Sequence, residues 1–239
     1  MGYSNNPRIV TDGLVLCLDA NDVKSYPGTG TIWYDLSGNN YDLTLQNSPT
    51  YVSDKGGFLL DGVDDYINGG ISPLDFTGTY TFEVWMKFNA GDSIGGGAHI
   101  IGSNGRGDGL LRGADGNNTH LTIDGSGNLK VFTFNGGGST DYDTGFNVSV
   151  GETCHVGFSH FSGAYKLGIK NGIQSASEST WSTQDFNYLI IGGEHNEAGY
   201  FTQMNYPNIT IYNVKCYTRI LSAKEVLQNF NAHKSRFGL

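Results

Sequence analysis

The amino-acid sequence predicts an all-β protein, a sandwich or barrel of short strands with one α-helix near its C-terminal end. Apolar and polar residues alternate with period two in several segments, and turn residues separate these segments. Glycine supplies 36 of the 239 residues, against an average usage of about 7%. Aromatic residues make up 13% of the chain, too many for a disordered protein. We expect an N-terminal arm over residues 1–12 and a single sandwich domain over residues 13–239.

The predicted strands follow one another along the chain. Leu14, Leu16 and Leu18 alternate with other residues, and the same alternation runs through residues 41–45, 81–88 and 165–170. Successive side chains of a strand point to opposite faces, so each segment presents one set of side chains to each side of a sheet. This pattern is typical of half-buried strands.

Turn residues separate the predicted strands. Asn171 and Gly172 predict a tight hairpin, because both residues tolerate a positive φ. Further turns are expected at residues 61–62, 115–116, 124–125 and 127–128. Two stretches rich in Gly, Asp, Asn and Ser, residues 91–116 and 135–151, are interpreted as long surface loops.

A helix is predicted over residues 222–236. Ser222 and Glu225 have the spacing of a capping box, in which the hydroxyl and the carboxylate satisfy backbone N–H groups of the first turn. An apolar stripe at helical spacing follows, formed by Ala223, Val226, Leu227 and Phe230. We expect this stripe to pack the helix against the sandwich.

The charge balance narrows the expected partners. The chain has 23 acidic and 14 basic residues, a formal net charge of −9. Nucleic-acid binding depends on basic residues that displace counterions, so we expect neither nucleic acid nor a membrane surface as partner. The sequence has no apolar run long enough for a transmembrane helix, and its first residues lack the features of a secretory signal. Glycans and other proteins stay open as partners.

The cysteines are interpreted as structural. Cys17, Cys154 and Cys216 are odd in number and include no closely spaced pair, which excludes an even disulfide framework. Free cysteine behaves as a small buried hydrophobe. Cys17 and Cys216 lie near opposite ends of the chain and come close together if their strands pair.

Five segments, in order, resemble the laminin-G-like, concanavalin A-like domains of bacterial and phage proteins. These segments comprise residues 13–38, 60–67, 80–87, 154–172 and 190–225. The resemblance implies a jelly-roll sandwich of two antiparallel sheets with its termini close together. Members bind glycans, proteins or calcium and some are enzymes, and the fold does not choose between these. The opening, residues 9–16 and 25–28, resembles virion structural proteins of tailed phages, including cyanophages.

Catalysis is not expected. Relatives that are retaining β-glucanases carry a Glu-x-Asp-x-x-Glu motif, because retention needs two carboxylates about 5–5.5 Å apart. None of the six glutamates lies in such a motif. His99, His155 and His160 fall within or beside predicted strands and are interpreted as packed or surface residues.

Calcium is the metal we consider, since it takes six to eight oxygen ligands from carboxylates, amides and carbonyls. The candidate ligands are Asp61, Asp64, Asp65 and Asp108, with Asp115 beside the last and a further pair at Asp141 and Asp143. The alternative is turn chemistry and solvated acids. A glycan platform is a second hypothesis, with its aromatic residues at Tyr142, Trp181, Tyr200 and Tyr206. For these, partial burial at sheet edges or subunit contacts is the alternative.

The functional hypothesis is a non-enzymatic structural protein on the surface of a phage virion. A capsid decoration protein is favoured, bound to other virion subunits, assembled as a homo-oligomer and presenting a protein-binding or glycan-binding face. The alternatives are a tail or fibre adhesin, a lectin-like carbohydrate-binding domain that recognises host surface glycans, and a hydrolase. Synthesis in the host cytoplasm without a signal peptide is expected.

Overall fold

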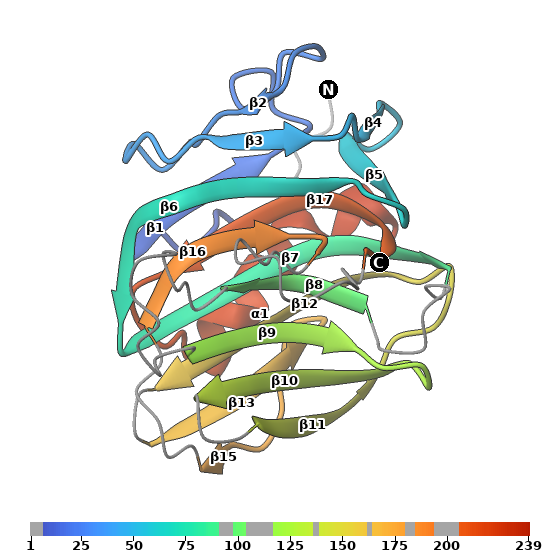
Figure 1. Ribbon diagram of the computed structural model, residues 1–239. Coiled ribbons are helices and arrows are strands. Elements are labelled where there is room, and N and C mark those ends of the chain that lie inside the picture. Colours follow the sequence, from blue (N-terminus) through green and yellow to red (C-terminus); the bar gives the residue numbers. More distant parts are fainter. Residues whose placement is uncertain are drawn as a thin grey trace, which may run out of the picture.

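The computed structural model describes residues 7–90, 98–103, 117–135, 139–161, 164–179, 185–193 and 206–239. Within these ranges, two antiparallel sheets face each other, and a single α-helix lies behind one of them (Figure 1). The predicted all-β sandwich with a short C-terminal helix is confirmed.

The first sheet, sheet A, carries the helix. Its described strands are β1 (Leu14–Asp19), β4 (Thr50–Val52), β5 (Gly57–Asp61), β7 (Thr79–Ala90), β12 (Thr153–Phe161), β13 (Tyr165–Lys170), β14 (Ile173–Gln174), β15 (Glu178–Ser179) and β17 (Asn208–Tyr217). The order across the sheet is β14-β13-β12-β7-β17-β5-β4, with β1 also beside β17 and β15 beside β13.

The second sheet, sheet B, lies in front of sheet A in Figure 1. Its described strands are β2 (Ile32–Trp33), β3 (Leu43–Gln46), β6 (Tyr66–Thr77), β8 (Ala98–Ser103), β9 (Asn117–Ile123), β10 (Asn128–Asn135), β11 (Ser139–Asn147) and β16 (Asp185–Ile191). The order across the sheet is β11-β10-β9-β8-β16-β6-β3-β2. Helix α1 (Ala223–His233) and the 3₁₀ helix η1 (Lys234–Phe237) complete the fold.

Strand β7 shows how the alternation places side chains. Phe82 and Val84 point into the core between the sheets, while Glu83 and Trp85 point to the outer face of sheet A. All four are fully buried. Phe82 and Val84 are covered by the facing sheet, and Glu83 and Trp85 are covered by α1 and η1. The ring of Trp85 stacks on Phe230, with 5.5 Å between the ring centroids.

Parts of the two predicted long loops are strands, so that prediction is wrong. Within residues 91–116, strand β8 places Ile100 and Ile101 in the core. Within residues 135–151, β11 forms an edge strand paired to β10. Its outward side chains, Asp141 and Asp143, are exposed, while Tyr142 packs against the core. The polar outer face of an edge strand gave this segment the composition of a loop.

The predicted hairpin at residues 171–172 joins β13 to β14. Asn171 has φ 47° and Gly172 has φ 81°, the positive values that a tight turn between twisted strands requires. A side chain at Gly172 would also come within 3.1 Å of Leu227 and Phe230 on α1. Glycine therefore serves both the turn and the helix packing here.

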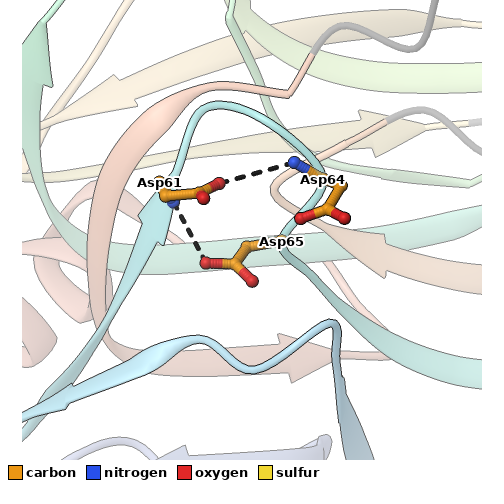
Figure 2. A group of neighbouring side chains, drawn as sticks. All are labelled: Asp61, Asp64 and Asp65. Atoms are coloured by element: carbon orange, nitrogen blue, oxygen red, sulfur yellow. Dashed lines mark hydrogen bonds between the residues drawn. The ribbon is translucent and has the colours of Figure 1, made fainter.

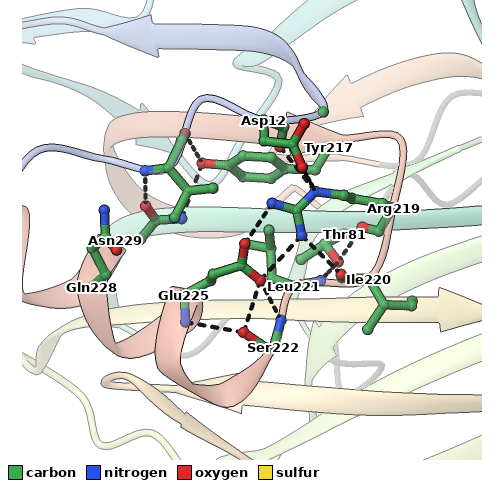
Figure 3. A network of polar contacts seen from close by, with 12 residues as sticks. Asp12, Thr81, Tyr217, Arg219, Ile220, Leu221, Ser222, Glu225, Gln228 and Asn229 are labelled. Carbon is green, nitrogen blue, oxygen red and sulfur yellow. Dashed lines mark hydrogen bonds and ion pairs between the residues drawn. The ribbon is translucent and has the colours of Figure 1, made fainter.

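The predicted capping box starts helix α1. The Ser222 hydroxyl accepts from the Glu225 backbone N–H, and the Glu225 carboxylate accepts from the Ser222 backbone N–H. Figure 3 shows that Arg219 joins this cap to the N-terminal segment. Its guanidinium donates to both Glu225 carboxylate oxygens, at 2.6 and 3.1 Å, and its Nε lies 2.9 Å from Asp12 Oδ2. The hydrogen bonds from Arg219 lower the pKa of Glu225 to about 2.

The apolar stripe predicted for α1 is only partly correct. Val226 is buried, but Leu227 is 47% exposed and Ala223 is exposed as well. The buried position on this face is taken by Asn229, which is fully buried. The reason is that the outer face of sheet A carries the buried carboxylate of Glu83, which needs a hydrogen-bond donor from the helix.

Asn229 is the centre of a buried polar network. Its Nδ2 donates to Glu83 Oε2 (2.6 Å) and to the Tyr217 hydroxyl (3.0 Å), and its Oδ1 accepts from the Val10 backbone N–H (2.8 Å). The Tyr217 hydroxyl donates to the Val10 carbonyl (3.1 Å). His155 Nε2 lies 3.5 Å from the second oxygen of Glu83. The network joins the two central strands, the helix and the N-terminal segment.

The cysteines are buried and free, which agrees with their interpretation as structural residues. Strands β1 and β17 do pair, with Leu16 opposite Cys216 and Cys17 opposite Lys215. Cys216 therefore faces the core while Cys17 faces the other side of sheet A. Burial raises the pKa of both thiols. The two residues are neighbours in the sheet but point to opposite faces.

We predict that Asn229→Ala destabilises the fold by about 3 kcal/mol, because it leaves the buried Glu83 Oε2 and the Val10 backbone N–H without hydrogen-bond partners. The free energy of unfolding, measured in urea, tests this. Gln228→Ala is the matched control, since the half-buried Gln228 donates one solvent-exposed hydrogen bond, to the Arg8 carbonyl, and its loss should cost less than about 1 kcal/mol. Equal losses for the two variants would contradict a special role for Asn229.

Candidate functional site

The turn between β5 and β6 gathers three of the predicted acidic residues (Figure 2). Asp61 ends β5, and its Oδ1 accepts from the backbone N–H groups of Val63 (2.8 Å) and Asp64 (3.4 Å). Gly62 has φ 82°, which closes the turn. Asp65 Oδ2 accepts from the Asp61 backbone N–H (3.2 Å). The turn thus holds all three aspartates in one short loop.

The three carboxylates are close to one another. One oxygen of each lies within 4.8 Å of an oxygen of the others. Asp61 and Asp64 are exposed, whereas Asp65 is 4% exposed. Burial, followed by the negative charge of Asp61, raises the pKa of Asp65 to about 6. In the described part of the chain, no basic side chain forms an ion pair with these acids.

This donor set suits a calcium ion. Carboxylate oxygens at such separations are the ligands that Ca²⁺ prefers, and its coordination tolerates irregular geometry. A cation there would offset the repulsion between the carboxylates.

Two tyrosines lie at the same end of the sandwich. Tyr66 follows the acidic turn directly, and its ring centroid lies 6.2 Å from that of Tyr206, with 33° between the ring planes. Both residues are half-buried. Burial raises the pKa of both phenols, and the charge of Asp64 contributes to the rise at Tyr206. The acidic turn and the tyrosine pair together are called the rim site below.

Other candidate residues lie elsewhere. Tyr142 is on β11, where its hydroxyl bonds to the Ser175 hydroxyl (3.1 Å) and to the Ala176 carbonyl. Asp141 and Asp143 share the outer face of that strand. The predicted residues outside the described ranges are Asp108, Asp115, Trp181 and Tyr200.

The sequence interpretation missed Tyr66 as a member of the site. Its position directly after three acids in five residues was the available signal, because a strand that starts at a turn presents its first side chain beside that turn. No local sequence pattern could have indicated the contact between Tyr66 and Tyr206, since 140 positions separate them in the sequence. His155 and His160 are fully buried, as expected for packed residues.

The fold is that of a lectin-like sandwich domain. The chain belongs to the concanavalin A-like lectin/glucanases superfamily, whose laminin G type family model matches residues 61–227. No curated protein matches the sequence.

Several solved structures share the fold. The Trypanosoma rangeli sialidase in complex with sialic acid has a TM-score of 0.69 and 16% identity over 98% of this chain and 36% of that one. The binding domain of Paraclostridial Mosquitocidal Protein 1 has a TM-score of 0.69 and 18% identity, over 93% of this chain and 53% of that one. The receptor binding domain of botulinum neurotoxin C/D mosaic serotype has a TM-score of 0.64 and 16% identity, over 92% and 51%.

These similarities describe the fold alone, because the identities are low. The chain spans about a third of the sialidase and about half of the two binding domains. Among the described residues, no helix has the length and apolar character needed to cross a bilayer.

We predict that the side chain of Asp65 titrates near pH 6 in the folded protein, and that Asp64→Asn lowers this pKa by removing a neighbouring negative charge. Carboxyl ¹³C chemical shifts measured against pH test this. A raised folded-state pKa means that Asp65 favours folding below pH 4 and that this contribution is lost as the pH rises through 6. Asp143→Asn, on β11, is the control. A pKa near 3.8, or one that Asp64→Asn leaves unchanged, would contradict the described environment.

Proposed function

We propose that this chain is a non-catalytic, lectin-like binding domain that holds a glycan at the rim site. The observation that carries the proposal is the meeting of a half-exposed tyrosine pair with three clustered carboxylates. Sugar rings pack their C–H faces on aromatic rings, and their hydroxyl groups donate hydrogen bonds to carboxylates. The rim site offers both kinds of contact on adjacent residues.

Calcium is part of the proposal. Asp61, Asp64 and Asp65 would hold the ion, and a bound cation would supply positive charge to which sugar hydroxyl oxygens can add as ligands. The protein's own contribution is the turn, which presents the carboxylates together, and the ring of Tyr206 beside them. Burial is the main cause of the raised pKa of Asp65, and a bound cation would relieve the smaller part that comes from the negative charge of Asp61.

Two of the similar structures and the sequence support binding over catalysis. Two of the similar structures are described as a binding domain and a receptor binding domain, which fits a glycan-binding role. The third is a sialidase, but this chain spans about a third of it. The sequence also lacks the Glu-x-Asp-x-x-Glu motif of the glucanases.

A glycan array followed by titration calorimetry with the best ligand tests the rim site. We expect Tyr206→Ala to weaken binding at least tenfold, because it removes the stacking surface, while Tyr206→Phe retains most of the affinity. EDTA should weaken binding and added Ca²⁺ should restore it. Tyr34→Ala, at a tyrosine that is 42% exposed elsewhere, is the control.

Three results would contradict this function. They are the absence of any glycan ligand, an unchanged affinity in Tyr206→Ala, and the release of sugar from the ligand. Binding that survives EDTA would remove calcium from the proposal, and the tyrosine pair would then be the part of the rim site that holds the glycan.

We further propose that the domain works on the exterior of a tailed-phage virion, where it decorates the capsid as a homo-oligomer bound to other virion subunits. The resemblance of residues 9–16 and 25–28 to virion structural proteins supports this setting. The strongly acidic composition also fits a partner other than the packaged nucleic acid. A tail or fibre adhesin is the alternative arrangement, and it would use the rim site against host glycans.

Purified particles from the source of this sequence test the setting. We expect the chain to co-sediment with capsids in many copies per particle and to be released as an oligomer. Density for the chain on the tail would favour the adhesin. Its absence from every virion fraction would contradict both arrangements.

A further inference from the structure

A hollow on the outer face of sheet A extends along β7 and β17 from Asn208, which pairs with Asp61 at the edge of the acidic turn. Its volume is about 370 Å³, toward the lower end of the range of about 300–1,000 Å³ that is usual for ligand pockets. Strands β7 and β17 form its floor, and the β4–β5 hairpin forms a wall. The side chains that matter to the argument are Lys55, Leu59, Lys87, Asn89, Thr210 and Tyr212.

The hollow exists because α1 and η1, which together cover the outer face of sheet A, extend only part of the way along β7. Phe237 of η1 stacks on Trp85, with 4.4 Å between the ring centroids. Lys87 and Asn89 are the next two positions that face outward, and both are half-buried. A bulge in β17 between Ile211 and Asn213 accompanies this change. The end of this helical cover therefore forms one side of the hollow, which is lined there by polar residues.

The walls of the hollow are held in place. Arg236 donates to the backbone carbonyls of Lys55 (2.8 Å) and Gly56 (2.8 Å), and it pairs with Asp19 (2.7 Å). These contacts tie the β4–β5 hairpin to η1. On the η1 side, the Tyr212 ring packs against Phe237, with 4.9 Å between the ring centroids. A ligand would therefore meet a preformed site.

The charge of the hollow is opposite to that of the protein. Lys55 and Lys87 line it with a single acid, Asp54, although the chain carries a net charge of −9. Among the described residues, the Lys87 ammonium has no ion-pair partner. The ammonium of a half-buried lysine without a counter-charge favours an anion beside it.

The floor also offers hydrogen bonds in a fixed geometry. Asn89 Nδ2 donates to Thr210 Oγ1 (3.0 Å), so each side chain orients the other. Within the described part of the chain, the side-chain oxygen of Asn89 and the hydroxyl proton of Thr210 form no other hydrogen bond, so both can bond a ligand. Leu59 and the ring of Tyr212 add apolar surface on either side. A ligand that matches has a carboxylate, several hydroxyl groups and a compact ring with apolar C–H faces.

We propose that this hollow binds a uronic acid, a sugar unit that carries a carboxylate. The carboxylate pairs with Lys87, the hydroxyl groups bond to Asn89 and Thr210, and the ring packs against Tyr212. The inference does not rest on the rim site.

Titration of the full chain with D-glucuronate, followed in ¹H–¹⁵N NMR spectra at constant ionic strength, tests the proposal, with D-glucose as the neutral probe. We expect saturable shifts in the amides of residues 87–89 and 210–212 with glucuronate, and an affinity at least fivefold lower for glucose. Lys87→Gln should reduce the glucuronate affinity at least fivefold. Lys224→Gln, which removes the same charge from an exposed position on α1, should leave it unchanged.

Further variants separate this site from the rim site and from loss of folding. Tyr206→Ala and Asp64→Asn should leave the glucuronate affinity unchanged. Asn89→Ala, at a half-buried surface position, should weaken binding of both probes while the rest of the spectrum is retained. The proposal is overturned if glucuronate causes no saturable shifts at these amides, if glucose binds equally well, or if Lys87→Gln binds like the original chain.

Discussion

The burial of one carboxylate on the outer face of sheet A is the constraint on which the rest of the structure depends. Glu83 lies on the central strand β7 and is fully covered, so its charge needs hydrogen-bond donors from whatever covers it. Asn229 meets this need and in the same step binds Val10 and Tyr217. The cover, the central strands and the N-terminal segment are therefore joined by a single amide side chain.

This arrangement separates a structural part of the molecule from the parts to which we assign ligand binding. The aromatic stack of Phe230, Trp85 and Phe237 and the polar network close most of the outer face of sheet A. Where the cover stops, Lys87 and Asn89 stand half-buried in a hollow with fixed walls. The described hydrogen bonds of the acidic turn between β5 and β6 do not involve α1 or η1, and the carboxylates of Asp61 and Asp64 are exposed.

The fold by itself does not choose between binding and catalysis. Similar sandwiches occur in a sialidase and in the binding domains of a mosquitocidal protein and a botulinum neurotoxin. The choice depends on the side chains that the turns and sheet faces present. Here the rim site combines carboxylate oxygens with aromatic surface. The hollow combines the Lys87 ammonium, which has no ion-pair partner among the described residues, with fixed amide and hydroxyl groups. These are the contacts on which the two proposals of sugar binding rest.

Local patterns in the sequence determined the strands with apolar alternation, the Asn171–Gly172 hairpin and the Ser222–Glu225 cap, because each depends on neighbours a few positions away. They also identified the acidic turn at residues 61–65. They failed for β11, whose polar outer face resembles a loop, and for Asn229, which lies where an apolar stripe was expected. Only the tertiary structure brought Tyr206 to Tyr66, and Asn229 to Glu83, 146 positions away. The order and packing of the strands and the helix set such contacts, and they produce no periodic pattern in the sequence.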